Sequence, residues 1–271
     1  MTNTNAIGIF DSGIGGLTVA NAIFDLLPNE QLIYFGDTAN IPYGTKSQSL
    51  IERLSIAISR FLIEEKKCKA IVLACNTASA AALTSIRSMW PSFPFVGMEP
   101  AVKPAVKATQ NGKIGVLATA GTFGSERYAS LVKRYAEDVE VFEDPCLGLV
   151  QLIESGKQDA IETRMLLEGV LHPMLQKRVD TFVLGCTHYP FITPLLGSIL
   201  GKESTIINPA PAVARQLKKV LQQNNLEREN PFLGKQQFYI SAYNEAFDAM
   251  LKQHCKMPYV LSPLEEGLPL V

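Results

Sequence analysis

Two short stretches of the chain resemble one another, and they constrain the fold more than any other feature. They are residues 70–79, AIVLACNTAS, and residues 181–190, TFVLGCTHYP. Each is a run of apolar residues typical of a strand buried on both faces, followed at once by a cysteine and small polar residues. Ligands bind at the carboxyl ends of parallel strands, because helix N-termini and free backbone amides converge there. The sequence therefore predicts a two-sided site that contains Cys75 and Cys186.

Strands and helices alternate along the first part of the chain. Apolar runs predict strands at 6–10, 31–35 and 94–98, besides the strand before Cys75, and amphipathic patterns predict helices at 17–27 and 47–66. Between the first strand and helix lies a glycine-rich turn, Asp11 to Gly16. Its spacing matches neither dinucleotide nor P-loop motifs, and an acid at its head would repel phosphate, which disfavours a nucleotide site.

The same pattern restarts after Glu99. The expected strands are 113–117, 139–142, 204–207 and 237–240, besides the strand before Cys186, and the expected helices are 147–156, 161–176, 191–200 and 212–223. The interval from Ser12 to Cys75 nearly equals that from Thr119 to Cys186. We therefore expect an α/β protein of two similar, open, mostly parallel-sheet lobes related by pseudo-symmetry, with the site between them.

The remaining C-terminal elements are too few for a domain of their own. We expect them to fold back on the first lobe, so that one domain comprises residues 1–97 plus 209–271 and the other comprises 98–208.

Composition narrows the class of protein. The 271 residues are 47% hydrophobic, which allows a sizeable core. Twenty-five basic and 26 acidic residues give a net charge of −1, and no long block of one sign occurs, so no nucleic-acid partner is expected. No apolar run approaches the roughly 18 to 20 residues that span a bilayer, and the N-terminus lacks a basic region, so we expect a soluble, cytoplasmic protein without a membrane partner. Five irregularly spaced cysteines predict reduced thiols.

The neighbours of the two strand-end cysteines favour a functional site. A cysteine after a buried strand can also be a small core residue. However, hydrogen-bonding side chains follow both cysteines where a core position would have apolar partners: Asn76, Thr77 and Ser79 after the first, and Thr187, His188 and Tyr189 after the second. Cys68 and Cys255 lie in charged, surface-like surroundings and Cys146 follows a proline, so these three are interpreted as structural.

Two rival chemistries use the same residues. Cys75, Cys186, His188 and Asp11 could surround a zinc ion, but the close-spaced ligand pairs of structural zinc sites are absent. A single thiolate with His188 or His172 as its base could transfer an acyl group, which would leave the second cysteine without a role.

Two matched acids on opposite sides of a site suit a racemase. One group removes a proton from a carbon, and the other delivers a proton to the opposite face. A thiol has an ordinary pKa of about 8.5, which nearby donors can lower, so one thiol can act as base while the other acts as acid. Backbone amides at helix starts would hold the carboxylate of an amino acid and stabilise the developing carbanion.

Five blocks occur in order along the chain: 10–16 (FDSGIGG), 37–44 (DTANIPYG), 74–79 (ACNTAS), 118–122 (ATAGT) and 185–190 (GCTHYP). Together they resemble the glutamate racemases of the cofactor-independent aspartate/glutamate racemase superfamily. The Pro-Tyr-Gly block favours glutamate racemase over aspartate racemase.

The resemblance implies a role for each matching residue. Cys75 and Cys186 would be the two catalytic acid/bases that interconvert L- and D-glutamate, with Asp11 supporting the first and Glu154 and His188 supporting the second. Substrate would be bound by Asp11, Ser12, Tyr43, Gly44, Asn76, Thr77, Thr187 and His188, with Thr119 and Thr122 as additions. Simpler interpretations remain open, namely Asp11 as a helix cap, Glu154 as an exposed helix residue, His188 as a residue that only orients its loop, and Tyr43 as a packing residue.

The family further implies supply of D-glutamate for peptidoglycan, no metal, no pyridoxal phosphate and a homodimer. Two departures from the family pattern occur, at Asn208, where many members have aspartate, and at Pro145–Cys146, where the family often has Cys-Pro. An aspartate racemase and a non-catalytic protein that binds a small ligand remain alternatives.

Overall fold

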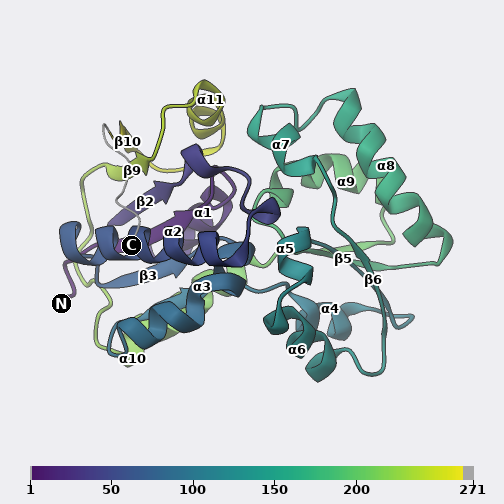
Figure 1. The fold of residues 1–271 in the computed structure, drawn as a ribbon, viewed down its shortest axis with the longest axis horizontal. Coiled ribbons are helices and arrows are strands. Elements are labelled where there is room, and N and C mark those ends of the chain that lie inside the picture. The colour runs from purple at the N-terminus through teal and green to yellow at the C-terminus, as the bar shows by residue number, and fades with distance from the viewer. Residues whose placement is uncertain (1, 265–271) are drawn as a thin grey trace.

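Two parallel sheets form the frame of the molecule (Figure 1). The computed structural model describes residues 2–264. The first sheet has the strand order β10-β9-β2-β1-β3-β4 and the second has the order β6-β5-β7-β8. The strands are β1 Ile7–Asp11, β2 Leu32–Gly36, β3 Ala70–Leu73, β4 Phe95–Gly97, β5 Lys113–Leu117, β6 Glu140–Asp144, β7 Thr181–Leu184, β8 Thr205–Ile207, β9 Gln236–Ile240 and β10 Tyr259–Pro263.

Helices cover the sheets, as expected when βα units form parallel sheets. They are α1 Leu17–Leu26, α2 Gln48–Arg60, α3 Asn76–Met89, α4 Val102–Ala108, α5 Ala120–Phe123, α6 Glu126–Tyr135, α7 Leu149–Glu154, α8 Ile161–Gln176, α9 Thr193–Leu200, α10 Ala210–Gln223 and α11 Glu245–His254. Within the described residues, none of these helices is long and apolar enough to cross a membrane.

The two sheets share one topology. In each, the first strand of the lobe lies between the second and the third, and the fourth lies beyond the third. This confirms the predicted α/β class with two similar lobes. The C-terminal strands β9 and β10 extend the first sheet beyond β2. The C-terminal part of the chain therefore completes the sheet that β1 to β4 begin (Figure 1). The exact domain boundaries at 97/98 and 208/209 remain predictions.

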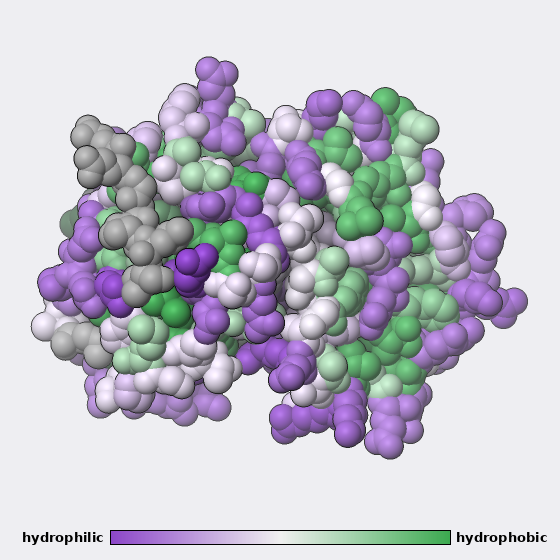
Figure 2. All heavy atoms as spheres, in the orientation of Figure 1, coloured by the Kyte–Doolittle hydropathy of each residue, from purple (hydrophilic) through white to green (hydrophobic). Residues whose placement is uncertain are grey.

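Apolar packing joins the lobes as well as filling them. Strands β1, β3 and β7 are buried at every position, which explains their continuous apolar sequences. One buried cluster includes Ile14 and Leu17 of the first lobe together with Tyr189 and Leu196 of the second. Figure 2 shows polar residues over much of one face, with apolar residues in view around α7 and α8, where Leu147, Ile161 and Met165 are exposed.

The surface-like setting predicted for Cys68 is wrong. Its side chain is buried, and its thiol would lie 3.2 Å from a Cβ atom added at Gly8. The chain turns inward at this point because Lys67 adopts a left-handed conformation and the Cys68 amide donates to the Leu62 carbonyl oxygen. Cys68 and Lys69 are therefore buried although they stand at the end of a run of charged residues. The charge of the neighbouring residues does not indicate this burial.

A buried ion pair closes the amino-terminal edge of the first sheet. Lys69 Nζ lies 2.6 Å from Glu30 Oε2, and both side chains are almost fully shielded from solvent. Lys69 also donates to the Asn3 carbonyl oxygen, and Glu30 accepts the Arg228 amide at 2.8 Å. Burial lowers the pKa of Lys69, while its contact with Glu30 opposes that shift. The pair thus joins four segments of the first lobe that are separate along the chain.

We expect Lys69→Met to lower the free energy of unfolding by about 3–5 kcal/mol, because it leaves the Glu30 carboxylate buried without its cation. Lys113→Met is the matched control, since Lys113 and Glu140 form an exposed pair at 3.6 Å, and it should cost less than about 1 kcal/mol. Urea unfolding measures both changes. Equal losses in the two variants would contradict the assignment.

Candidate active site

A cavity lies between the lobes at the carboxyl ends of the central strands. From the first lobe it is lined by the predicted residues Ser12, Tyr43, Gly44, Cys75, Asn76 and Thr77. From the second lobe it is lined by the predicted residues Thr119, Cys186, Thr187 and His188. The structure therefore brings both strand-end cysteines to one cavity from opposite sides.

Three predicted residues lie behind the cavity wall. Asp11, Thr122 and Glu154 are buried, and they act on the cavity through other side chains. The burial of Glu154 excludes the interpretation of an ordinary exposed helix residue.

The cavity is small, with a volume of about 50 Å³. By the same kind of measure one water molecule occupies roughly 10–15 Å³. The cavity is therefore of a size for a small molecule.

Cys75 lies at the start of α3, where its Sγ accepts a hydrogen bond from the Ala78 amide at 3.4 Å. Burial raises the pKa of the Cys75 thiol well above its ordinary value, and the nearby Asp11 carboxylate raises it further. The amides of Ala78 and Ser12 oppose the shift without cancelling it. Cys75 is therefore a protonated thiol in the ligand-free protein.

Asp11 links the first lobe to the second. Its Oδ2 accepts the amides of Gly13 and Gly16, at 3.1 and 3.0 Å, and its Oδ1 accepts the Thr187 hydroxyl of the other lobe at 3.2 Å. Burial raises the pKa of Asp11, against the opposing charge of His188 and the two amides. The residue thus holds the turn before α1, as the capping interpretation expects, and also contacts the opposite half of the site.

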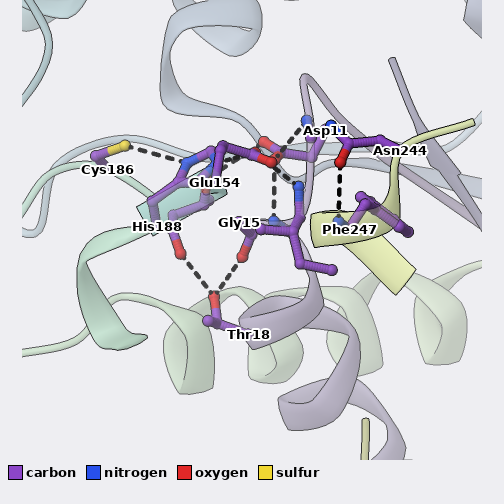
Figure 3. A network of polar contacts seen from close by, with 12 residues as sticks. Asp11, Gly15, Thr18, Glu154, Cys186, His188, Asn244 and Phe247 are labelled. Carbon is purple, nitrogen blue, oxygen red and sulfur yellow. Dashed lines mark hydrogen bonds and ion pairs between the residues drawn. The ribbon is translucent and has the colours of Figure 1, made fainter. Parts of the chain in front are cut away.

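The second cysteine lies in a different environment. His188 Nδ1 is 3.6 Å from Cys186 Sγ, and His188 Nε2 is 2.5 Å from Glu154 Oε1 (Figure 3). Burial acts to lower the pKa of His188, but the hydrogen bonds and charges of Cys186 and Glu154 outweigh it and raise that pKa well above its ordinary value. The imidazolium therefore keeps both protons and donates one toward the Cys186 sulfur.

Glu154 also joins the two lobes, because its Oε1 accepts the Ile14 amide at 2.9 Å. The glycine turn of the first lobe makes this approach possible. A Cβ atom at Gly13 would lie 1.9 Å from Glu154 Oε1, and one at Gly15 would lie 2.5 Å from His188 Nδ1. Because these glycines have no side chain, Glu154 and His188 of the second lobe can pack against the turn.

Polar groups complete the cavity on the side of α3 and α5. The hydroxyl groups of Thr77, Thr119 and Thr122 form a chain with spacings of 2.9 and 3.1 Å that crosses between the lobes. The buried Asn76 amide has no hydrogen-bond partner among the described residues. An unpartnered buried amide at a cavity wall is a group that a ligand can satisfy.

Cys146, interpreted from the sequence as structural, lines the cavity, and so does Tyr189 of the second repeated stretch. Cys146 and Tyr189 are buried in its wall on the side of the second lobe, next to the start of α7. Cys146 has a left-handed backbone, with φ of 45°, and its amide donates to Asp144 Oδ1 at 2.7 Å. Cys146 belongs to neither repeated stretch, so the repeat gave no signal for it. The only local signal was Pro145, which indicates a turn at this point.

Neither rival chemistry gains support from the geometry. His172 is exposed on α8 and does not line the cavity, so it cannot serve either thiol as a base. Among residues 2–264, no group of three or more histidine, cysteine, aspartate or glutamate side chains has an arrangement that could hold a metal ion.

Comparison with known proteins gives a consistent result. The family model for Asp/Glu/Hydantoin racemase matches residues 15–217. The glutamate racemase of Pseudomonas aeruginosa is 52% identical over 216 residues, which are 80% of this chain and 81% of that protein. Glutamate racemase of Francisella tularensis in complex with D-glutamate superposes with a TM-score of 0.84, at 31% identity over 97% of this chain and 98% of that one. The Escherichia coli enzyme in complex with L-glutamate and an activator gives 0.86, at 30% identity over 98% and 100%.

The His188–Glu154 pair predicts a pH-dependent stability. The pKa of His188 in the folded protein is raised above the ordinary value of about 6.5. The stabilisation that the charged imidazole gives to the folded protein is therefore complete below about pH 6.5 and is lost as the pH rises toward the folded pKa. The stability advantage of the wild type over His188→Gln should therefore shrink above about pH 6.5, by at most about 1.4 kcal/mol per pH unit. Urea unfolding at a series of pH values measures it.

His172→Gln, an exposed change on α8, controls for loss of an imidazole and should show little dependence of this kind. An advantage of the wild type over His188→Gln that grows as the pH rises toward about 6.5 and then stays constant would show that the imidazole is buried uncharged.

Proposed function

The chain belongs to the Asp/Glu/hydantoin racemase family, as a glutamate racemase, and we propose that Cys75 and Cys186 carry out its reaction as a pair of acid and base. The observation that carries this proposal is that the two cysteines line one cavity from opposite lobes, each after the third strand of its lobe. Thiols on opposite sides of a bound amino acid can remove and return the α-proton on its two faces.

The surroundings of the two sulfurs differ, and this difference supplies one acid and one base. In the proposed mechanism Cys186, toward which the His188 imidazolium donates, starts as the base. Burial and Asp11 keep Cys75 protonated. In one direction the Cys186 thiolate removes the α-proton and the Cys75 thiol protonates the opposite face of the carbanion. After this step Cys186 is a thiol and Cys75 is a thiolate. These are the acid and the base for the reverse direction.

Neutral donors would hold the substrate. Within the described chain, no lysine or arginine lines the cavity. The amides at the start of α3, the Asn76 side chain and the threonine hydroxyl groups are therefore the groups available for carboxylates. Donors fixed at the α-carboxylate stabilise the charge that develops when the α-proton leaves. Without a lysine in the wall, no imine with a pyridoxal cofactor can form here, and the proposed reaction uses no cofactor.

Glutamate is the proposed substrate because the relatives of known structure were captured with L-glutamate and D-glutamate. By the same family resemblance we propose that the chain supplies D-glutamate for peptidoglycan and works as a homodimer in the cytoplasm. All five cysteines are free thiols, as a reducing compartment requires. Assays with glutamate and aspartate side by side distinguish the two racemases.

Cys75→Ser and Cys186→Ser should each lower turnover by about a hundredfold to ten-thousandfold, because each removes one acid/base group from the proton transfer. Circular dichroism should show the fold unchanged. Cys255→Ser is the matched control, since Cys255 lies outside the cavity, and its turnover should equal that of the wild type. Normal turnover in either active-site variant would refute the two-base mechanism.

In heavy water the wild type should incorporate deuterium at the α-carbon of glutamate. A protein that only binds glutamate would incorporate none, so this measurement tests the activity independently of the cysteine assignment. Exhaustive dialysis against EDTA should leave turnover unchanged, because the proposed proton transfers need no metal. Loss of turnover that added metal restores would count against a cofactor-independent reaction.

A further inference from the structure

Asp37 is a buried carboxylate that does not line the cavity but lies directly behind one of its walls. It follows β2, and three side chains donate hydrogen bonds to it. The Tyr43 hydroxyl donates to Oδ2 at 2.6 Å, while Asn40 Nδ2 and the Ser241 hydroxyl donate to Oδ1 at 3.0 and 2.7 Å. A buried carboxylate with several donors is a fixed point of the structure, because each lost donor leaves charge unsatisfied.

The wall in front of Asp37 is the segment 42–45, and every one of its four residues lines the cavity. The Tyr43 hydroxyl points away from the ligand space into Asp37. Burial and the Asp37 charge raise the pKa of Tyr43 well above its ordinary value, so the hydroxyl keeps its proton and remains the donor. Tyr43 therefore presents its backbone and ring to a ligand, while its hydroxyl anchors the segment.

The anchored segment also contacts the second lobe. A Cβ atom at Gly44 would lie 2.8 Å from Thr119 Cβ, so the backbone of the segment packs directly on Thr119. Thr119 is the middle member of the hydroxyl chain that crosses the site. A shift of Tyr43 would consequently disturb groups on both sides of the cavity.

The C-terminal part of the chain holds this arrangement from behind. Strand β9 pairs with β2, and the Ser241 amide continues the ladder by donating to the Gly36 carbonyl oxygen at 3.1 Å. The Ser241 hydroxyl also accepts the Ala39 amide at 2.9 Å. Next to it, Thr38 Oγ1 donates to the Ala242 carbonyl oxygen and accepts the Ala242 amide. The loop after β2 is thus fastened to the loop after β9.

We propose that Asp37 and Ser241 are positioning residues of the substrate site, which hold segment 42–45 in its ligand-binding form through the Tyr43 hydroxyl and the loop after β2. This inference rests on the proposed racemase activity and deepens it. It makes the C-terminal strand-loop unit part of the substrate-binding apparatus, although Ser241 does not line the cavity. Since the segment binds ligand and performs no proton transfer, its loss should affect KM more than kcat.

The test compares steady-state kinetics of Asp37→Asn, Ser241→Ala, Tyr43→Phe and the double variant Asp37→Asn/Tyr43→Phe with both glutamate enantiomers. Asp37→Asn and Tyr43→Phe should raise KM by about tenfold or more, and Ser241→Ala by about threefold, with kcat within about threefold of the wild type. The double variant should have a KM close to that of the worse single variant, because both changes act on the same contact: Asp37→Asn removes the charge of the acceptor and Tyr43→Phe removes the donor.

Tyr128→Phe is the matched control. Tyr128 is buried and donates to a carboxylate, Glu143, at 2.7 Å, but the pair lies in the second lobe outside the cavity. Its loss should leave KM unchanged. Thermal unfolding of all variants shows whether each is folded, and Ser241→Ala, which retains the carboxylate, provides a second variant should Asp37→Asn fail to fold.

The outcomes separate this inference from the proposed function. A wild-type protein that incorporates no deuterium into glutamate would overturn the function itself. An active wild type whose Asp37→Asn and Ser241→Ala variants keep KM within twofold would overturn only the positioning role. So would fully additive effects in the double variant, or an equal rise of KM in Tyr128→Phe.

Discussion

The contact on which the site depends is the Glu154 carboxylate held between the two lobes. One of its oxygens accepts the Ile14 amide of the first lobe and also meets the His188 imidazole of the second. In a buried setting such charge-assisted contacts are strong. Removal of one partner leaves the other group buried and unpaired, which destabilises the folded protein. The contact between the lobes and the charge of His188 are therefore coupled, since the same carboxylate serves both.

Two lobes of one topology create a site whose halves are chemically unlike. Both cysteines follow equivalent strands, yet Cys75 has a carboxylate nearby and Cys186 has an imidazolium. Each of these neighbours is contacted from the opposite lobe: Thr187 donates to Asp11, and the glycine turn of the first lobe lies against Glu154 and His188. An approximate symmetry thus places two cysteines on opposite sides of one cavity, and departures from that symmetry give them different neighbours.

The sequence allowed good prediction of those elements whose pattern is local. The helix 161–176 and the strand 113–117 have the predicted bounds, because amphipathic and apolar periods are visible within one segment. Helices α3, α4, α5, α6 and α11 and strand β10 were not predicted. The first residues of α3 are small and polar because they line the cavity, so they resemble a loop. Cys68 and Lys69 are buried within a charged run, because Glu30, distant in sequence, provides the partner for the lysine.

By itself the sequence determined that two cysteines end two buried strands beside small polar residues, because strand burial and turn chemistry depend on near neighbours. Only the tertiary structure decided what surrounds them. Glu154 reaches Ile14 across 140 positions, and Ser241 reaches Asp37 across 204. Contacts over such separations leave no periodic pattern in the chain, since they arise only when the sheets and lobes bring the two segments together. For that reason the cavity wall at Cys146 and the anchor behind Tyr43 became visible only in the fold.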